Sequence, residues 1–194
     1  HRDLHSFPTR RSSDLTIEKL TSAGYVFIGM DHFAKPTDDM AVALKEKKLY
    51  RNFQGYSTHS GTDLYGFGIT SISQIGNVYA QNVKKEKEYF EHLQKGLIPV
   101  EKGYHLNEDD ILRRSVITRV MCDFELDFAN VESKFQIKFE DYFANGLNSL
   151  KEMVDDGLIE IAGRKILVTD MGRLLIRNVA MAFDGYIERK EDTG

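Results

Sequence analysis

The sequence predicts an α/β protein in two parts, in which a strand-containing region is followed by a mainly helical, winged-helix-like domain. Two short, nearly continuous apolar runs, YVFIGM at 25–30 and LYGFGITSI at 64–72, are typical of strands buried on both faces in a parallel sheet. From residue 101 onward the apolar residues follow a helical period. The predicted order there is helix, helix, helix, hairpin, helix, which is the order of a winged-helix domain.

The first residues differ from the rest, because His1–Leu15 shows neither helical nor strand periodicity. His5–Leu15 is also what a common short-read sequencing adapter would encode if translated in frame. We therefore treat residues 1–15 as a non-native leader that is excluded from the fold, with a natural disordered basic tail as the alternative. The helical pattern of Thr16–Ala23 then begins abruptly, as in the back half of a longer protein.

Residues 16–100 form the first predicted region. Gly24 ends the opening helix, and the strand at 25–30 delivers Asp31, His32 and Phe33 to the position where barrel strands present groups to a ligand. The remaining predicted elements, in chain order, are an amphipathic helix at 38–47, a loop at 50–62, the second buried strand at 64–72 and a charged helix at 81–93.

Residues 101–194 form the second predicted region. Asn107 is the expected N-cap of its first helix, and acidic residues through Asp110 suit the helix dipole. The predicted elements that follow are a short helix at 131–135, a longer helix at 139–154 that ends before Gly157, a hairpin of strands at 158–161 and 166–169, and a final helix at 171–187.

Composition excludes several classes of protein. The 194 residues carry 26 basic and 30 acidic side chains, a net charge of −4, which argues against a protein whose main task is binding nucleic-acid phosphates. A single cysteine, Cys122, excludes a disulfide framework and any cysteine-ligated cluster or zinc site made by this chain alone. No apolar run approaches the ~20 residues of a membrane span, so we expect a cytoplasmic protein.

The segment Arg51–Tyr56 (RNFQGY) is the first candidate site. It places a Phe and a Tyr among side-chain amides and a cation. Such a set suits a pocket for a flat polar ligand, because the rings can stack on the ligand while the amides and the guanidinium bind its edges and carboxylates. The alternative from composition alone is a loop whose aromatic rings pack beneath the sheet.

Other candidates have simpler interpretations. Asp31, His32 and His59 could bind a metal, but a histidine paired with a neighbouring carboxylate is favoured. Cys122 lies on the apolar stripe of a helix and is expected to be inert core. The basic pairs could bind phosphate, although ion pairs with the abundant carboxylates are favoured; these pairs are Arg113 with Arg114 and Arg173 with Arg177.

Five segments also resemble a known family, the oxygen-independent coproporphyrinogen III oxidases. They are FIGMDHFAKPTDDMAVA (27–43), LYRNFQGYSTHSGTDLYGFGITSIS (49–73), YAQN (79–82), DDILRRSVI (109–117) and GRLLIRNVAMAFDGY (172–186). The RNFQGY motif separates the chain from the related haem-chaperone branch, whose corresponding loop has an Asn-centred motif leading to a Tyr-Trp pair. This chain contains no Trp.

The resemblance implies the C-terminal part of an incomplete (β/α) radical S-adenosylmethionine barrel, followed by the winged-helix-like domain over the substrate side. It implies an oxidoreductase of haem biosynthesis that decarboxylates two propionates of coproporphyrinogen III to vinyl groups, giving protoporphyrinogen IX. In the parent enzyme a [4Fe–4S] cluster reduces S-adenosylmethionine with electrons from a donor. The resulting 5′-deoxyadenosyl radical removes a propionate hydrogen, after which carbon dioxide and an electron are lost.

The resemblance also implies site residues. Ile72 would line the S-adenosylmethionine pocket, and Phe53 and Gln54 would face the reaction cavity as catalytic residues. Asp31, His32, Arg51 and Tyr56 are further substrate-pocket candidates. The family's CxxxCxxC motif is missing, so we expect no metal site here and an inactive, monomeric fragment of an active parent. The alternatives are a haem-chaperone relative and a winged-helix nucleic-acid-binding module.

Overall fold

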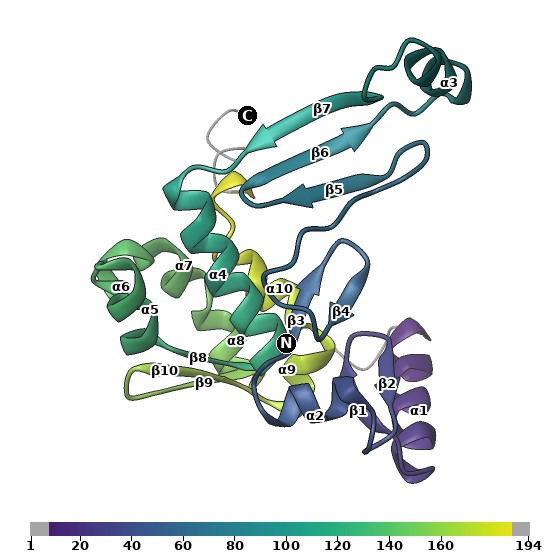
Figure 1. The fold of residues 1–194 in the computed structure, drawn as a ribbon. Coiled ribbons are helices and arrows are strands. Elements are labelled where there is room, and N and C mark those ends of the chain that lie inside the picture. The colour runs from purple at the N-terminus through teal and green to yellow at the C-terminus, as the bar shows by residue number, and fades with distance from the viewer. Residues whose placement is uncertain (1–7, 188–194) are drawn as a thin grey trace.

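A computed structural model describes residues 8–187, with side chains from residue 14 onward (Figure 1). The first part contains α1 (Pro8–Ser22), β1 (Val26–Gly29), β2 (His32–Ala34), α2 (Asp39–Lys45), β3 (Tyr50–Asn52), β4 (Gly55–Ser57), β5 (Ile72–Ile75), β6 (Val78–Asn82), α3 (Glu86–Gln94) and β7 (Val100–His105). The second part contains α4 (Glu108–Asp123), β8 (Glu125–Asp127), α5 (Phe128–Phe135), α6 (Phe139–Tyr142), α7 (Ala144–Ser149), α8 (Lys151–Asp155), β9 (Ile159–Ala162), β10 (Lys165–Val168), α9 (Asp170–Leu174) and α10 (Ile176–Met181). The predicted α/β class is confirmed.

Helix α1 extends into the segment that the sequence set apart as a leader. The helix begins at Pro8 rather than at Thr16, so the expectation of no helix before residue 16 is wrong for residues 8–15. A proline is tolerated in the first turn of a helix, and each residue added to a formed helix gains a backbone hydrogen bond. Residues 1–7 of the expected leader lie outside the described residues.

The first apolar run forms a strand, but its pairing differs from the prediction. β1 pairs antiparallel with β2, and Phe27 lies opposite Phe33, so the expected parallel pairing is wrong within this chain. The connection is tight because Gly29 (φ 148°) and Met30 (φ 54°) both have positive φ. Asp31 therefore lies at the tip of a hairpin. The predicted helix at 38–47 is confirmed as α2, whose first turn is capped by the Asp38 carboxylate.

The second predicted strand, at 64–72, is wrong for residues 64–71, and only Ile72 lies in a strand, β5. The segment before β5 is irregular and exposed, and the Phe67 side chain is 88% accessible. Left-handed backbone at Gly68 (φ 94°) and Thr70 (φ 60°) prevents a continuous strand here. Strands β5, β6 and β7 instead form an antiparallel sheet that projects from the body, with α3 at its far end (Figure 1). The predicted helix at 81–93 accordingly starts later, at Glu86.

The expected boundary between the two regions, after residue 100, lies at the start of β7, which pairs with β6. Helix α4 follows β7 and begins as predicted. The Asn107 side chain accepts a hydrogen bond from the Asp110 backbone N–H, and the Asp110 carboxylate accepts one from the Asn107 N–H (both 2.9 Å).

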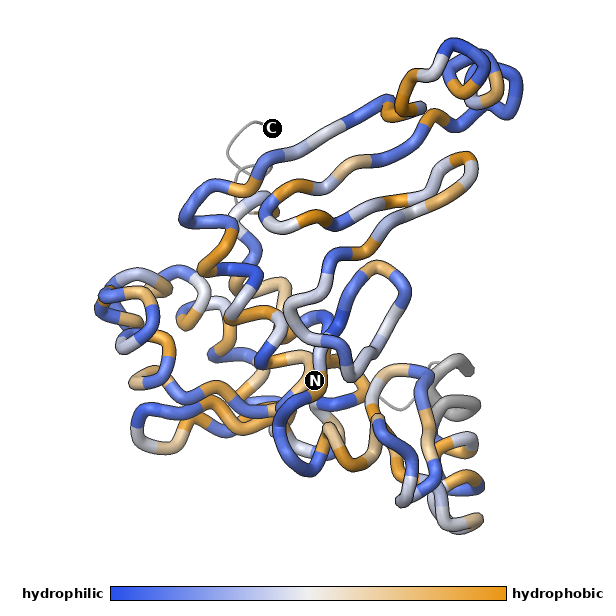
Figure 2. Tube along the Cα trace, in the orientation of Figure 1, coloured by the Kyte–Doolittle hydropathy of each residue, from blue (hydrophilic) through white to orange (hydrophobic). Residues whose placement is uncertain are grey.

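The buried side of α4 forms the centre of the second part. Its apolar residues pack against strands β8–β10 and helix α10. In Figure 2 these elements carry many hydrophobic residues, whereas α3 is mainly hydrophilic. The stacked rings of Phe128 and Phe139 (4.1 Å between centroids) and the buried Phe183 fill the space beside them. Cys122 is fully buried, as expected.

The winged-helix pattern is confirmed with changes in helix continuity. The predicted hairpin is β9–β10, to which β8 adds an unpredicted third strand in the order β8-β10-β9. The predicted helix at 139–154 is broken into α6, α7 and α8, and the helix predicted at 171–187 is broken at Leu175 into α9 and α10. Among residues 8–187, no helix is long and apolar enough to cross a membrane.

We expect residues 1–14 to be dispensable for folding. Their deletion should change the free energy of unfolding by less than ~0.5 kcal/mol, because the following residue, Leu15, is itself half exposed. Urea denaturation of the full and shortened chains measures this. A loss several times larger would show that the segment packs on the domain.

Gly172 should be intolerant of any side chain. A Cβ at this position in α9 would lie 1.8 Å from the carbonyl oxygen of Leu158, the residue before β9. Gly172→Ala should therefore lower the free energy of unfolding by roughly 3 kcal/mol. Gly103→Ala is the matched control, since its Cβ would meet nothing nearer than 3.9 Å. Equal denaturation midpoints for the two variants would contradict the close contact.

Candidate functional site

The RNFQGY segment forms a β-hairpin, so the expectation of a loop at 50–62 is wrong for residues 50–57. Arg51 pairs with Tyr56, and Asn52 pairs with Gly55. Phe53 and Gln54 are the two turn residues. The Asn52 side-chain oxygen accepts the Gln54 backbone N–H (2.8 Å), and Gly55 takes a φ of 129°. The turn is therefore fixed by an Asx-type bond and a glycine.

Tyr56 anchors this hairpin to helix α4. Its ring is buried, and its hydroxyl donates to the Met121 carbonyl oxygen (3.0 Å). The Arg51 guanidinium lies 4.9 Å from the ring centroid. Burial raises the pKa of Tyr56 to about 12, so the hydroxyl is a neutral donor at physiological pH.

His32 joins the same cluster from the β1–β2 hairpin. Its ring meets the Tyr56 ring edge-on at 5.2 Å. His32 Nδ1 lies 2.8 Å from an Asp31 carboxylate oxygen, within ion-pair distance but not aligned for a hydrogen bond. Asp31 is itself 85% exposed. His32 Nδ1 and Arg51 Nη1 are both buried atoms without a hydrogen-bond partner in the described part of the chain.

Two glycines allow the hairpins to approach this closely. A Cβ at Gly55 would lie 2.9 Å from His32 Nε2, and one at Gly29 would lie 2.5 Å from the Tyr56 hydroxyl. The sequence therefore needs glycine on both hairpins for Tyr56 and His32 to meet.

Phe53 extends from the hairpin toward the β5–β7 sheet. Its ring is 53% exposed and packs edge-on against Tyr79 of β6, with 5.0 Å between centroids. Ile72 opens β5 opposite Gln81 of β6 and is half buried. The Gln54 side chain is exposed and makes no hydrogen bond within residues 8–187.

The structure thus places the predicted residues in two groups. Arg51, Tyr56 and His32 share one contact cluster, with Asp31 at its exposed rim. Phe53 and Gln54 lie at the hairpin tip. Ile72 lies in the β5–β7 sheet, which the Phe53 ring contacts at Tyr79. His59 does not complete a metal site with Asp31 and His32, and no group of three His, Cys, Asp or Glu residues among the described residues could hold a metal ion.

Sequence reasoning missed the position of Arg173. This side chain lies between the rings of Phe27 (5.1 Å) and Phe124 (4.2 Å) and donates to the Phe27 carbonyl oxygen (2.7 Å). Burial lowers its pKa, and its nearest carboxylate, Asp170, is 3.9 Å away. The favoured ion-pair interpretation is confirmed for Arg113, which contacts Asp109 at 2.8 Å, whereas Arg173 mainly joins β1 to α9. No local pattern marks such a contact, because its partners are distant in sequence.

The cysteine content does not fit an iron–sulfur cluster. A [4Fe–4S] centre takes several thiolate ligands from protein, and this chain has one cysteine. Cys122 is fully buried, and burial raises its pKa to about 12. The half-buried Ile72 and the exposed Phe53 and Gln54 do fit a ligand that needs apolar contact and one polar edge.

Comparison with known proteins gives consistent matches. The HemN C-terminal domain family matches residues 106–175. The chain is 49% identical to the oxygen-independent coproporphyrinogen III oxidase of Synechocystis sp., 47% identical to that of Escherichia coli and 40% identical to that of Helicobacter pylori. Each match covers 90% of this chain and 38% of the relative.

A solved structure agrees with these matches. It is described as coproporphyrinogen III oxidase from Escherichia coli, a radical SAM enzyme, and superposes with a TM-score of 0.86 at 46% identity. The superposition covers 90% of this chain and 40% of that structure. The chain therefore spans about two fifths of the length of the proteins that it matches.

The Tyr56 hydroxyl should hold the hairpin on α4. Tyr56→Phe removes the donor to the Met121 carbonyl and should lower the free energy of unfolding by about 1 kcal/mol. Tyr65→Phe is the matched control, because Tyr65 is 59% exposed. Chemical denaturation compares them, and an equal effect of both substitutions would count against the anchor.

Proposed function

The chain belongs to the oxygen-independent coproporphyrinogen III oxidase family, and from this premise we propose that it serves the oxidative decarboxylation of coproporphyrinogen III to protoporphyrinogen IX. The observation that carries the proposal is the likeness to a radical SAM enzyme across 90% of the chain, at 46% identity and a TM-score of 0.86. This chain spans 40% of that structure. The activity would therefore also need the part of the longer enzyme that this chain does not match.

The residues of this chain would bind and position rather than form the radical. One cysteine cannot ligate the cluster, so we assign no cluster-dependent step to this chain. S-adenosylmethionine, when bound, supplies the group that removes hydrogen from the substrate. Phe53, Gln54 and Ile72 would hold that molecule and the substrate in register, since transfer of a hydrogen atom requires the two carbons at near contact.

The chemistry of each side chain supports its role. The exposed Phe53 ring offers an apolar surface at the tip of a hairpin whose turn is fixed by Asn52. The Gln54 amide has both a donor and an acceptor to orient a polar edge. Ile72 would contribute shape by packing against the bound molecule.

Arg51 and His32 support a second role, in binding the substrate. In the cluster built on Tyr56, Arg51 keeps a nitrogen without a hydrogen-bond partner among the described residues, and His32 Nδ1 lies 2.8 Å from the carboxylate of the exposed Asp31. Carboxylates are the ligands that such groups bind best, and the substrate bears propionates. With Asp31 at the rim, these four residues would form one wall of the substrate pocket. We further propose that the chain is cytoplasmic and monomeric, and that the parent enzyme receives electrons from a separate donor.

A winged-helix nucleic-acid-binding function is disfavoured by charge. The segment that would serve as recognition helix, α6–α8, carries acidic residues against a single lysine, Lys151. Such a surface repels phosphates. Salt-dependent retardation of DNA in an electrophoretic assay would favour this alternative, whereas haem titration tests the chaperone alternative.

The proposed positioning roles can be tested in a chimera. This chain replaces the matching part of the Escherichia coli relative, and protoporphyrinogen formation is measured under anaerobic reduction. Phe53→Ala, Gln54→Ala and Ile72→Ala should each lower turnover at least about tenfold, because small displacements of reacting groups are costly. Gln54→Ala should cost ~1–3 kcal/mol through an unpaired polar partner.

The matched control is Phe90→Ala, which removes a comparably exposed ring (51%) from α3. Each variant is checked for wild-type iron content and melting temperature. Normal turnover in folded, cluster-loaded variants would remove the three residues from the site. Turnover lost together with iron or fold would show that they are structural.

A further inference from the structure

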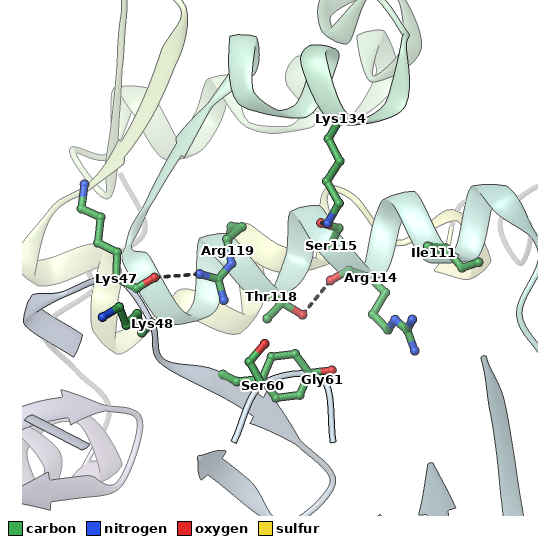
Figure 3. A pocket seen from close by; sticks show the side chains of 11 residues that line it. Lys47, Lys48, Ser60, Gly61, Ile111, Arg114, Ser115, Thr118, Arg119 and Lys134 are labelled. Atoms are coloured by element: carbon green, nitrogen blue, oxygen red, sulfur yellow. Dashed lines mark hydrogen bonds between the residues drawn. The ribbon is translucent and has the colours of Figure 1, made fainter. Parts of the chain in front are cut away.

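A cleft of about 440 Å³ lies between α4, α5 and the chain segments around residues 47–61. Figure 3 shows Lys134 reaching from α5 toward α4, and the backbone of Ser60 and Gly61 facing the same helix from the other side. Of the residues that the structure describes, no acidic one lines the cleft, whereas five basic residues do: Lys47, Lys48, Arg114, Arg119 and Lys134. Its position is separate from the Phe53 tip and from Ile72.

Three of these cations are paired with carboxylates that do not themselves line the cleft. The pairs are Lys47 with Glu125 (2.5 Å), Lys48 with Glu46 (2.7 Å) and Arg119 with Asp123 (3.1 Å). Their charges are locally compensated, so they contribute less to the potential inside the cleft.

Arg114 and Lys134 differ, because neither lies within ion-pair distance of a carboxylate in residues 8–187. Neutral acceptors hold them instead. Arg114 donates to the Asn77 side-chain oxygen (3.1 Å) and to the Tyr79 hydroxyl (3.4 Å), and Lys134 donates to the Ser115 hydroxyl (3.3 Å). Such bonds fix two positive charges in place without neutralising them, and a guanidinium retains further N–H groups for a ligand.

Neutral donors complete the lining. The Ser115 hydroxyl accepts from Lys134 and the Tyr50 hydroxyl accepts from the Gln74 amide (3.2 Å). Each hydroxyl thus keeps its own proton to donate. The Ser60 hydroxyl lines the same space. The cleft combines two fixed charges with several uncharged donors, which is how proteins surround an oxyanion.

We propose that this cleft binds a small di- or polyanion through carboxylate or phosphate oxygens. The guanidinium of Arg114 can bind two oxygens side by side, while Lys134 and the Ser115 hydroxyl contact a neighbouring oxygen. The volume lies within the range of pockets for small molecules. The proposal uses none of the residues assigned to S-adenosylmethionine or substrate above. Failure of the anion-binding proposal would therefore leave the proposed function untouched, and the reverse also holds.

The test is an NMR titration of the 194-residue chain at constant ionic strength with pyrophosphate and, separately, with citrate. Saturable shifts of the backbone amides near Ser60, Gly61 and Ser115 are expected with at least one probe. Arg114→Gln and Lys134→Gln should each weaken that binding about tenfold, which is about 1.4 kcal/mol. Arg114→Lys, which keeps the charge, should recover part of the affinity. Lys151→Gln on α8, outside the cleft, is the matched control and should change affinity less than about twofold.

Binding of pyrophosphate alone identifies a phosphate-bearing ligand, and binding of citrate alone identifies a carboxylate-bearing one. Binding of both supports a general oxyanion site. A Kd above about 10 mM for both probes would overturn the proposal. So would a Kd that Arg114→Gln and Lys134→Gln leave unchanged in folded variants.

Discussion

Helix α4 is the element on which both parts of the molecule depend, because its opposite sides bind different neighbours. One side buries apolar residues in the core of the second part, namely Leu112, Val116 and Val120. The other side donates hydrogen bonds to the first part. Arg119 donates to the carbonyl oxygens of Lys47 (3.2 Å) and Leu49 (2.8 Å), and Arg114 donates to Asn77 and Tyr79. The chain from Lys47 to the RNFQGY hairpin is thereby held against a helix whose own position is set by the core.

The same helix positions the candidate site from its C-terminal end. The Met121 carbonyl accepts from Tyr56, and Phe124, in a left-handed backbone conformation (φ 56°), brings its ring to Arg173. Arg173 in turn donates to the Phe27 carbonyl of β1. Each hairpin of the site is therefore attached to the second part by a polar contact in an apolar setting, where a hydrogen bond left unmade is costly. Such attachments fix where the hairpins lie while leaving Phe53 and Gln54 exposed at the tip.

Local signals predicted much of the fold. The helix after Asp38, the cap at Asn107 and the turn between β9 and β10 were predicted correctly, because each depends on bonds between residues a few positions apart. The prediction failed at the second apolar run, because hydropathy does not show which backbone conformation its residues adopt. Gly68 and Thr70 adopt positive φ, so LYGFGITSI is an exposed loop that ends in a strand, although its hydropathy is that of a buried one. For the candidate site, the motif singled out residues 51–56 but did not predict the hairpin that they form, nor the part played by Arg173.

The sequence by itself determined the α/β class, the starts of α2 and α4, the winged-helix order and the resemblance to the family, since these follow from local bonds and from motifs written in the chain. Only the tertiary structure decided that β1 pairs antiparallel, that Tyr56 meets His32, and that Arg114 and Lys134 face one cleft without a carboxylate partner in residues 8–187. The physical reason is distance along the chain. The Tyr56 hydroxyl and its acceptor at Met121 are 65 residues apart, and Arg173 and its acceptor at Phe27 are 146 apart. Such contacts depend on how whole elements pack, and packing leaves no periodic signature in the sequence.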